Sequence, residues 1–157
     1  MLGTRTIGNP DQMHELGLEL GKALRAGDVL VLTGPLGAGK TTLTRGIGEG
    51  LGARGPVTSP TFVLARTHPS LVDGPPLVHV DAYRLNSAVE LDDLDIDFAH
   101  SVVVVEWGAG MLDGIVDSWL DVVIERPEGA NAGELGDELV EPRTVTLTGH
   151  GQRWEAA

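Results

Sequence analysis

The stretch "VLVLTGPLGAGKTTLTRGIGEGLG", from Val29 to Gly52, decides the fold. It opens with a short apolar run rich in valine, which is typical of a strand buried on both faces. A glycine-rich loop follows, and then Leu43, Ile47 and Leu51 recur at helical spacing on one apolar face. A strand, a glycine loop and a helix in this order predict an α/β domain.

The loop itself, "GPLGAGKT" from Gly34 to Thr41, matches the pattern G-x-x-x-x-G-K-[S/T]. Glycines at these positions let backbone N–H groups turn toward phosphate oxygens, and the helix N-terminus adds the positive end of its dipole. In such a loop Lys40 is placed to reach the β- and γ-phosphates, and the hydroxyl of Thr41 is placed to hold Mg²⁺. The motif and its context therefore predict a site for a nucleoside triphosphate.

Two carboxylates are candidates to work with this loop. Asp81 ends the apolar run "LVHVD", and Glu106 ends "VVVVE". In an open α/β sheet, the groups that hold a metal or position water come from the carboxyl ends of the strands beside the loop strand. Simpler roles stay open, because Glu106 could only cap its strand or pair with an arginine, and Asp81 could pair with Arg84.

The histidines show no metal-ligand spacing. For His79, which lies within "HVDAYR", we expect a packed or partner-bonded side chain.

The remaining patterns complete an expected P-loop NTPase fold, with a largely parallel central sheet flanked by helices and antiparallel strands added at one edge. Asn9 is the predicted N-cap of a first helix, and Gly27 its left-handed C-terminal glycine. The helix after the loop contains three further glycines, which either close packing or mobility must explain. Further strands are predicted at 2–7, 61–67, 77–81, 102–106, 120–126 and 143–148, and a helix at 87–98.

Composition sets the broad limits. The 157 residues suit one domain, 1–157, in which 127–142 reads as a mobile insertion between two strands. The absence of cysteine excludes disulfides and thiol catalysis. A net charge of −12 disfavours unaided binding to nucleic acid. Neither a signal peptide nor a membrane-spanning apolar run is seen, so we expect a cytoplasmic protein.

Four blocks of sequence together resemble one family. "GPLGAGKTT", "TSPTF", "HVDAYRL" with "ELDDL" shortly after, and "VVEWG" follow one another in this order from about residue 10 to residue 108. Their order and spacing are similar to those of the bacterial TsaE (YjeE) family, the small ATPase of tRNA threonylcarbamoyladenosine synthesis. The combination of "SPT", "HxDxYR" and "EW" is what separates this family from other proteins with a phosphate loop.

The resemblance implies an activity and partners. It implies that the chain binds ATP with Mg²⁺, hydrolyses ATP slowly, and associates with the TsaB–TsaD pair, which transfers the threonylcarbamoyl group to tRNA. The tRNA would then be contacted only through the complex, and an acidic subunit would need to meet only other proteins.

The resemblance also implies roles for individual residues. Thr41 and Glu106 would hold Mg²⁺, and Asp81 would position water or metal. Ser59 and Thr61 would lie on a nucleotide-responsive loop, and Trp107 would line the site. The phosphates would be contacted by Gly37, Ala38, Gly39, Lys40, Thr41 and Thr42.

Two other functions compete with this interpretation. A small-molecule P-loop kinase could use "DAYR" as an acceptor site, although the chain has no arginine cluster that would form a lid over the phosphates. A nucleotide-gated binding module, in which hydrolysis is incidental, differs only in whether turnover is needed.

Overall fold

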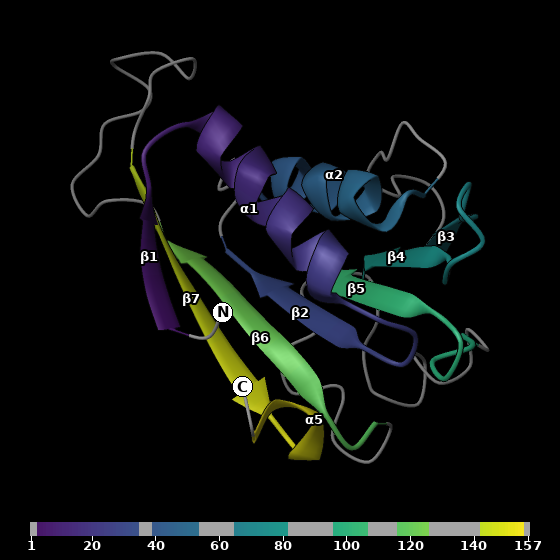
Figure 1. Cartoon of the computed structure of the whole chain (residues 1–157). Coiled ribbons are helices and arrows are strands. Elements are labelled where there is room, and N and C mark those ends of the chain that lie inside the picture. The colour runs from purple at the N-terminus through teal and green to yellow at the C-terminus, as the bar shows by residue number, and fades with distance from the viewer. Residues whose placement is uncertain are drawn as a thin grey trace.

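The computed structural model describes residues 3–34, 39–53, 65–81, 96–106, 116–125 and 142–155. These residues form a mixed α/β fold around a seven-stranded sheet with the order β1-β7-β6-β2-β5-β4-β3 (Figure 1). Its strands are β1 (Gly3–Ile7), β2 (Val29–Thr33), β3 (Ala65–His68), β4 (Leu77–Asp81), β5 (Val102–Glu106), β6 (Trp119–Glu125) and β7 (Arg143–His150). The described helices are α1 (Pro10–Ala23), α2 (Lys40–Leu51) and α5 (Gln152–Glu155).

The centre of the sheet is parallel and both of its edges are antiparallel. Strands β6, β2, β5 and β4 pair in parallel, while β7 and β1 extend one edge and β3 the other. The antiparallel strands predicted at one edge are therefore present, and β3 adds a second antiparallel edge that was not predicted. Only eight residues, 69–76, join β3 to β4, and a parallel crossover needs about a dozen or more. This pair can only be a hairpin.

The predicted strand positions agree with the observed strands to within two residues at each described end. For the strand predicted at 61–67, residues 61–64 lie outside the described part of the chain, and β3 continues to His68. Of the helix predicted at 87–98, only 96–98 are described, and they are not helical. Most of the predicted insertion at 127–142 also lies outside the described residues. In the described part of the chain, no helix is long and apolar enough to span a membrane.

The core lies on both faces of the parallel strands. Leu30, Leu32 and Val104 belong to the cluster that also contains the apolar residues of α1 and α2. Val31 and Val103 belong to a second cluster on the opposite face. Alternate residues of β2 and β5 are thus buried on opposite sides, which explains why their sequences are continuously apolar.

Helices α1 and α2 lie side by side on one face of the sheet (Figure 1), and their backbones meet at glycines. Gly17 faces Gly46, and Gly21 faces Gly50 one turn further along, so the two helices run in the same direction. A Cβ built at Gly46 would lie 2.9 Å from the Cα of Gly17, and closer still to the carbonyl oxygen of His14. Close packing therefore explains Gly46 and Gly50.

The first helix begins as predicted but ends earlier. The Asn9 side chain accepts a hydrogen bond from the backbone N–H of Gln12 at 2.8 Å, and the Gln12 side chain accepts one from Gly8 at 2.6 Å. Leu24 closes the helix in an extended conformation. Gly27 does have a positive φ of 96°, but it serves the turn into β2 and not the helix end.

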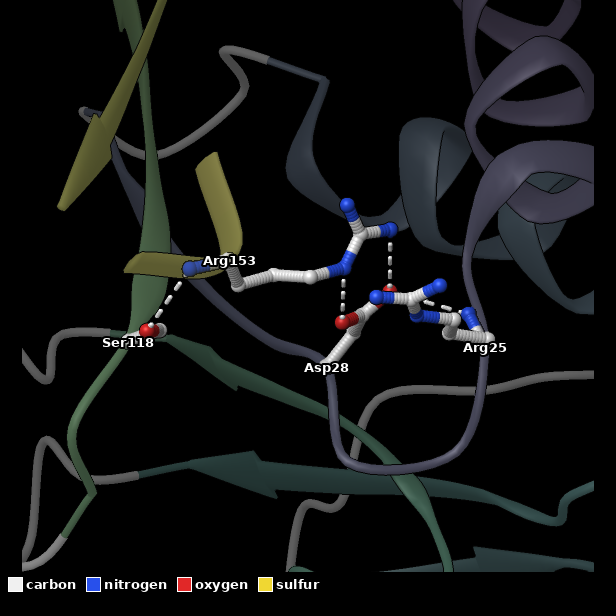
Figure 2. Close-up of polar contacts among 4 residues, drawn as sticks. All are labelled: Arg25, Asp28, Ser118 and Arg153. Atoms are coloured by element: carbon white, nitrogen blue, oxygen red, sulfur yellow. Dashed lines mark hydrogen bonds and ion pairs between the residues drawn. The ribbon is translucent and has the colours of Figure 1, made fainter. Parts of the chain in front are cut away.

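The C-terminal helix is fastened to the start of β2 by an ion pair (Figure 2). Arg153 donates from Nε and Nη2 to the two carboxylate oxygens of Asp28, at 2.9 and 3.1 Å. Asp28 is only 3% exposed and also accepts a bond from the backbone N–H of Arg25. The neighbouring Trp154 is buried in the core, with the Arg153 guanidinium 4.3 Å from its ring centroid.

Replacing Gly46 with alanine is expected to lower the free energy of unfolding by about 2 kcal/mol. The opposing atoms are backbone atoms, which cannot move aside easily, so overpacking should destabilise the fold by about 3 kcal/mol. The better helix propensity of alanine offsets about 1 kcal/mol of this loss. Urea unfolding measures the difference. Gly74→Ala is the control, because the nearest atom to its added Cβ is the Ser70 Oγ at 3.5 Å. Equal stability of the Gly46→Ala variant and the parent would contradict this account.

Arg153→Met is expected to lower the free energy of unfolding by about 2–3 kcal/mol, because it leaves the carboxylate of Asp28 buried without its cation. The figure is below the range for fully buried pairs because the Arg153 side chain is 26% exposed. Thermal unfolding provides the measurement. The control is Arg5→Met, which removes an exposed pair with Glu19 and should change stability by less than about 1 kcal/mol. The prediction fails if the two variants lose the same stability.

Candidate functional site

The site is centred on Lys40, the first residue of α2. Its ammonium group donates a hydrogen bond of 2.5 Å to the carbonyl oxygen of Gly34, the first glycine of the loop motif, and Lys40 is only 7% exposed. Gly39 precedes it with a φ of 112°, a left-handed conformation that favours glycine. A side chain at Gly39 would also press on Met13 of α1, whose Cε would lie 3.1 Å from the added Cβ.

The N-terminus of α2 has a glycine as its N-cap residue. The N-cap residue Gly39 has no side chain, and no side-chain cap bond is present at this helix end. The N–H groups of a first helical turn have no partners within the helix and carry the positive end of its dipole. By contrast, Asn9 caps the neighbouring helix α1. The end of α2 is therefore suited to receive an anion.

The electrostatics around Lys40 favour an anionic ligand as well. Burial lowers the pKa of Lys40, because a desolvated ammonium is disfavoured, while the nearby carboxylates of Glu106 and Asp81 act in the opposite direction and raise it. The net direction is downward. The two acids thus do not fully compensate the buried cation, and added negative charge near its ammonium would stabilise the charged form.

Both predicted carboxylates lie at the carboxyl ends of adjacent strands. Asp81 on β4 is the register partner of Glu106 on β5, and Glu106 is in turn the partner of Leu32 on β2. Residues in register on parallel strands project to the same face, which here is the face covered by α1 and α2. The structure therefore brings Lys40, Asp81 and Glu106 together at one end of the sheet.

Glu106 has a partner that the sequence did not specify. His79, fully buried on β4, contacts the Glu106 carboxylate through Nε2. This confirms that His79 is a packed, partner-bonded side chain. It also gives Glu106 a histidine as partner, where an arginine was considered from the sequence. The spacing of "HVD" was the sequence signal for this contact. Residues two apart on a strand share a face, so His79 lies on the same face as Asp81.

The other predicted site residues divide into two groups. Thr41 and Thr42 lie on the first turn of α2 and are partly buried. Gly37, Ala38, Ser59, Thr61 and Trp107 lie outside the described residues, as does Arg84, the alternative partner of Asp81. Sequence reasoning missed the carbonyl of Gly34 as an acceptor for Lys40, because a backbone carbonyl carries no residue-type signal.

The donor groups fit a hard divalent cation bound together with phosphate. Mg²⁺ is usually held by one or two carboxylates, phosphate oxygens and water, without a dedicated protein cage. The Thr41 hydroxyl and the Glu106 and Asp81 carboxylates supply oxygen ligands of this kind. The described residues contain no cluster of three or more histidine, cysteine, aspartate or glutamate side chains that could hold a metal.

The fold and the site define a class of protein. It is a mixed α/β protein with a buried lysine at a helix N-terminus and two carboxylates at the ends of adjacent strands. Comparison with known proteins makes the assignment specific. Residues 7–135 match the family model described as threonylcarbamoyl adenosine biosynthesis protein TsaE. The chain therefore belongs to the TsaE family, whose role is the biosynthesis of threonylcarbamoyladenosine in tRNA.

Individual relatives agree with this assignment. The chain is 57% identical over 148 residues to the tRNA threonylcarbamoyladenosine biosynthesis protein TsaE of Streptomyces coelicolor, covering 92% of this chain and 95% of the relative. It is 36% identical over 154 residues to the protein of the same name in Bacillus subtilis, with 96% and 87% covered. A crystal structure of Bacillus subtilis YdiB superposes with a TM-score of 0.67 at 31% identity, covering 98% of this chain and 88% of that one.

Proposed function

We propose that this chain is a Mg²⁺-dependent ATPase with slow turnover that serves tRNA threonylcarbamoyladenosine synthesis together with TsaB and TsaD. The observation that carries the proposal is the meeting of Lys40, at the start of α2, with Glu106 and Asp81 at the ends of two adjacent strands. Membership of the TsaE family supplies the pathway. The fold assignment that accompanies the proposal is a P-loop NTPase domain.

Each group has a role that follows from its chemistry. The Lys40 ammonium has three N–H donors, so it can keep its bond to Gly34 and still bind β- and γ-phosphate oxygens. The backbone N–H groups at the start of α2 add further donors. The Thr41 hydroxyl and the Glu106 carboxylate would hold Mg²⁺, which when bound neutralises charge on the phosphates. Asp81 would help to position the attacking water or the metal.

The acidic surface fits a subunit that meets proteins and leaves the tRNA to its partners. A net charge of −12 disfavours unaided binding of the chain to the phosphate backbone of nucleic acid. The local cation and helix end would still attract a nucleotide, because the field at short range is set by nearby groups. Binding of ATP and avoidance of tRNA are therefore compatible in one molecule.

Lys40→Ala is expected to weaken ATP binding roughly 10–100-fold and to abolish hydrolysis, since a charged hydrogen bond contributes about 1.5–3 kcal/mol. Fluorescent ATP-analogue titration and phosphate release are the measurements. Lys22→Ala is the matched control, because Lys22 is the only other lysine and lies exposed on α1. Unchanged affinity and turnover in Lys40→Ala would refute the site.

Phosphate release should also change when purified TsaB and TsaD are added to the parent chain. A hydrolysis rate that is unchanged by both proteins would argue against partner control. A screen of small-molecule phosphate acceptors would then decide whether the chain is a kinase.

Glu106→Gln is expected to reduce Mg²⁺-dependent turnover by at least about tenfold, with a smaller effect on nucleotide affinity. Even indirect partners of a bound metal contribute about 10–100-fold to metal affinity or activity, and the amide removes the negative charge. Steady-state hydrolysis at several Mg²⁺ concentrations measures the effect. Glu125→Gln, at the exposed end of strand β6, is the control. Equal turnover in the parent and the Glu106→Gln variant would leave Glu106 with a structural role only.

A further inference from the structure

We propose that His79 is a positioning residue that holds the Glu106 carboxylate in the orientation in which it binds the metal. The inference rests on the proposed function, because it concerns how the same site holds Mg²⁺. It assigns a role to a side chain that neither contacts phosphate in the proposed arrangement nor belongs to the loop motif.

The first observation is burial. His79 is 0% exposed and lies in the middle of β4, in register with Val104 of β5. A polar ring in such an apolar position is costly unless its nitrogens have partners. The sequence places leucine, valine and valine at the other interior positions of this strand. An apolar residue would fill the space without this cost. We therefore attribute the presence of the imidazole to its contact with Glu106.

The second observation is the direction of the hydrogen bond. Nε2 of His79 contacts Oε2 of Glu106, and a carboxylate can only accept, so Nε2 carries the proton. Nδ1 has no hydrogen-bond partner among the described residues. The contact with the Glu106 carboxylate therefore requires the Nε2–H tautomer of His79, with this N–H directed at Glu106.

The third observation is the position of the Glu106 carboxylate when it is bonded to His79. Glu106 ends β5 beside Lys40 and Asp81. An ionised carboxylate offers about four acceptor positions, and one bond to His79 leaves the others for a cation. Fixing one oxygen removes the rotational freedom that the side chain would otherwise lose on binding metal. Metal ligands are commonly oriented in this way by a second hydrogen-bonded group.

The test compares His79→Gln with His79→Met in the full-length chain. These side chains are similar in length, but only glutamine has an N–H donor near the position of Nε2. We expect His79→Met to raise the Mg²⁺ concentration for half-maximal ATP hydrolysis by about tenfold or more, and His79→Gln to stay within about threefold of the parent. Mg²⁺ titration of a bound fluorescent ATP analogue gives the same comparison without turnover.

A double-variant cycle separates positioning from general structural damage. If His79 acts through Glu106, then His79→Met should add little to the Mg²⁺ requirement of the Glu106→Gln variant. Additive effects would overturn the proposal, and so would an unchanged Mg²⁺ requirement in His79→Met. His100→Leu is the control, because it removes an exposed histidine–aspartate pair elsewhere.

A measurement on the unsubstituted chain covers the case in which His79→Met does not fold. Nitrogen-15 NMR of labelled histidine distinguishes the tautomers, and a proton on Nε2 of His79 is the expected result. An Nε2 without a proton would overturn the inference. The same sample also tests the proposed function. If the parent folds with this tautomer but binds no Mg-ATP, the proposed function is refuted, and the positioning role of His79 is refuted with it.

Discussion

The close contact between the backbones of α1 and α2 is the constraint on which the site depends. Helices usually keep their axes about 8–10 Å apart because side chains separate them, whereas here Gly17 and Gly21 bring the Cα atoms of one helix against Gly46 and Gly50 of the other. Since the helices run in the same direction, their N-termini lie at the same end, and Met13 of α1 packs against Gly39. The position of α2 over the sheet fixes where Lys40 enters the site.

At that end of the sheet the fold concentrates polar groups that the rest of the core excludes. Strands β4 and β5 are apolar up to His79, Asp81 and Glu106, and Lys40 is buried beside them. Burying a lysine costs free energy that its two carboxylates offset only in part, as the direction of its pKa shows. Such partly compensated sites are common where a ligand completes the charge balance. The stability of the glycine contact and of the C-terminal ion pair can offset this local cost.

The sequence predicted the parts of this arrangement that have local causes. The Asn9 cap, the two-sided burial of "VLVLT" and the strand-end positions of Asp81 and Glu106 each follow from a few neighbouring residues. The antiparallel edge strand β3, the contact of His79 with Glu106 and the bond from Arg153 to Asp28 were not predicted. These pairs are joined by tertiary structure, across 125 residues in the last case, and no periodicity records them. The glycines were the intermediate case. Those of the second helix were expected to reflect either close packing or mobility, and the structure shows close packing against the glycines of the first helix.

The two ends of the sheet carry different kinds of polar contact. Arg153 and Asp28 join the C-terminus to the amino-terminal side of β2, whereas Lys40, Asp81 and Glu106 gather at the carboxyl ends of the strands. The buried β2 and β5 connect these ends and have no polar side chain between them except at their last residues. A continuously apolar layer therefore separates the stabilising contacts at one end from the candidate ligand site at the other. Substitutions at Arg153 should accordingly affect unfolding far more than nucleotide affinity, and those at Lys40 the reverse.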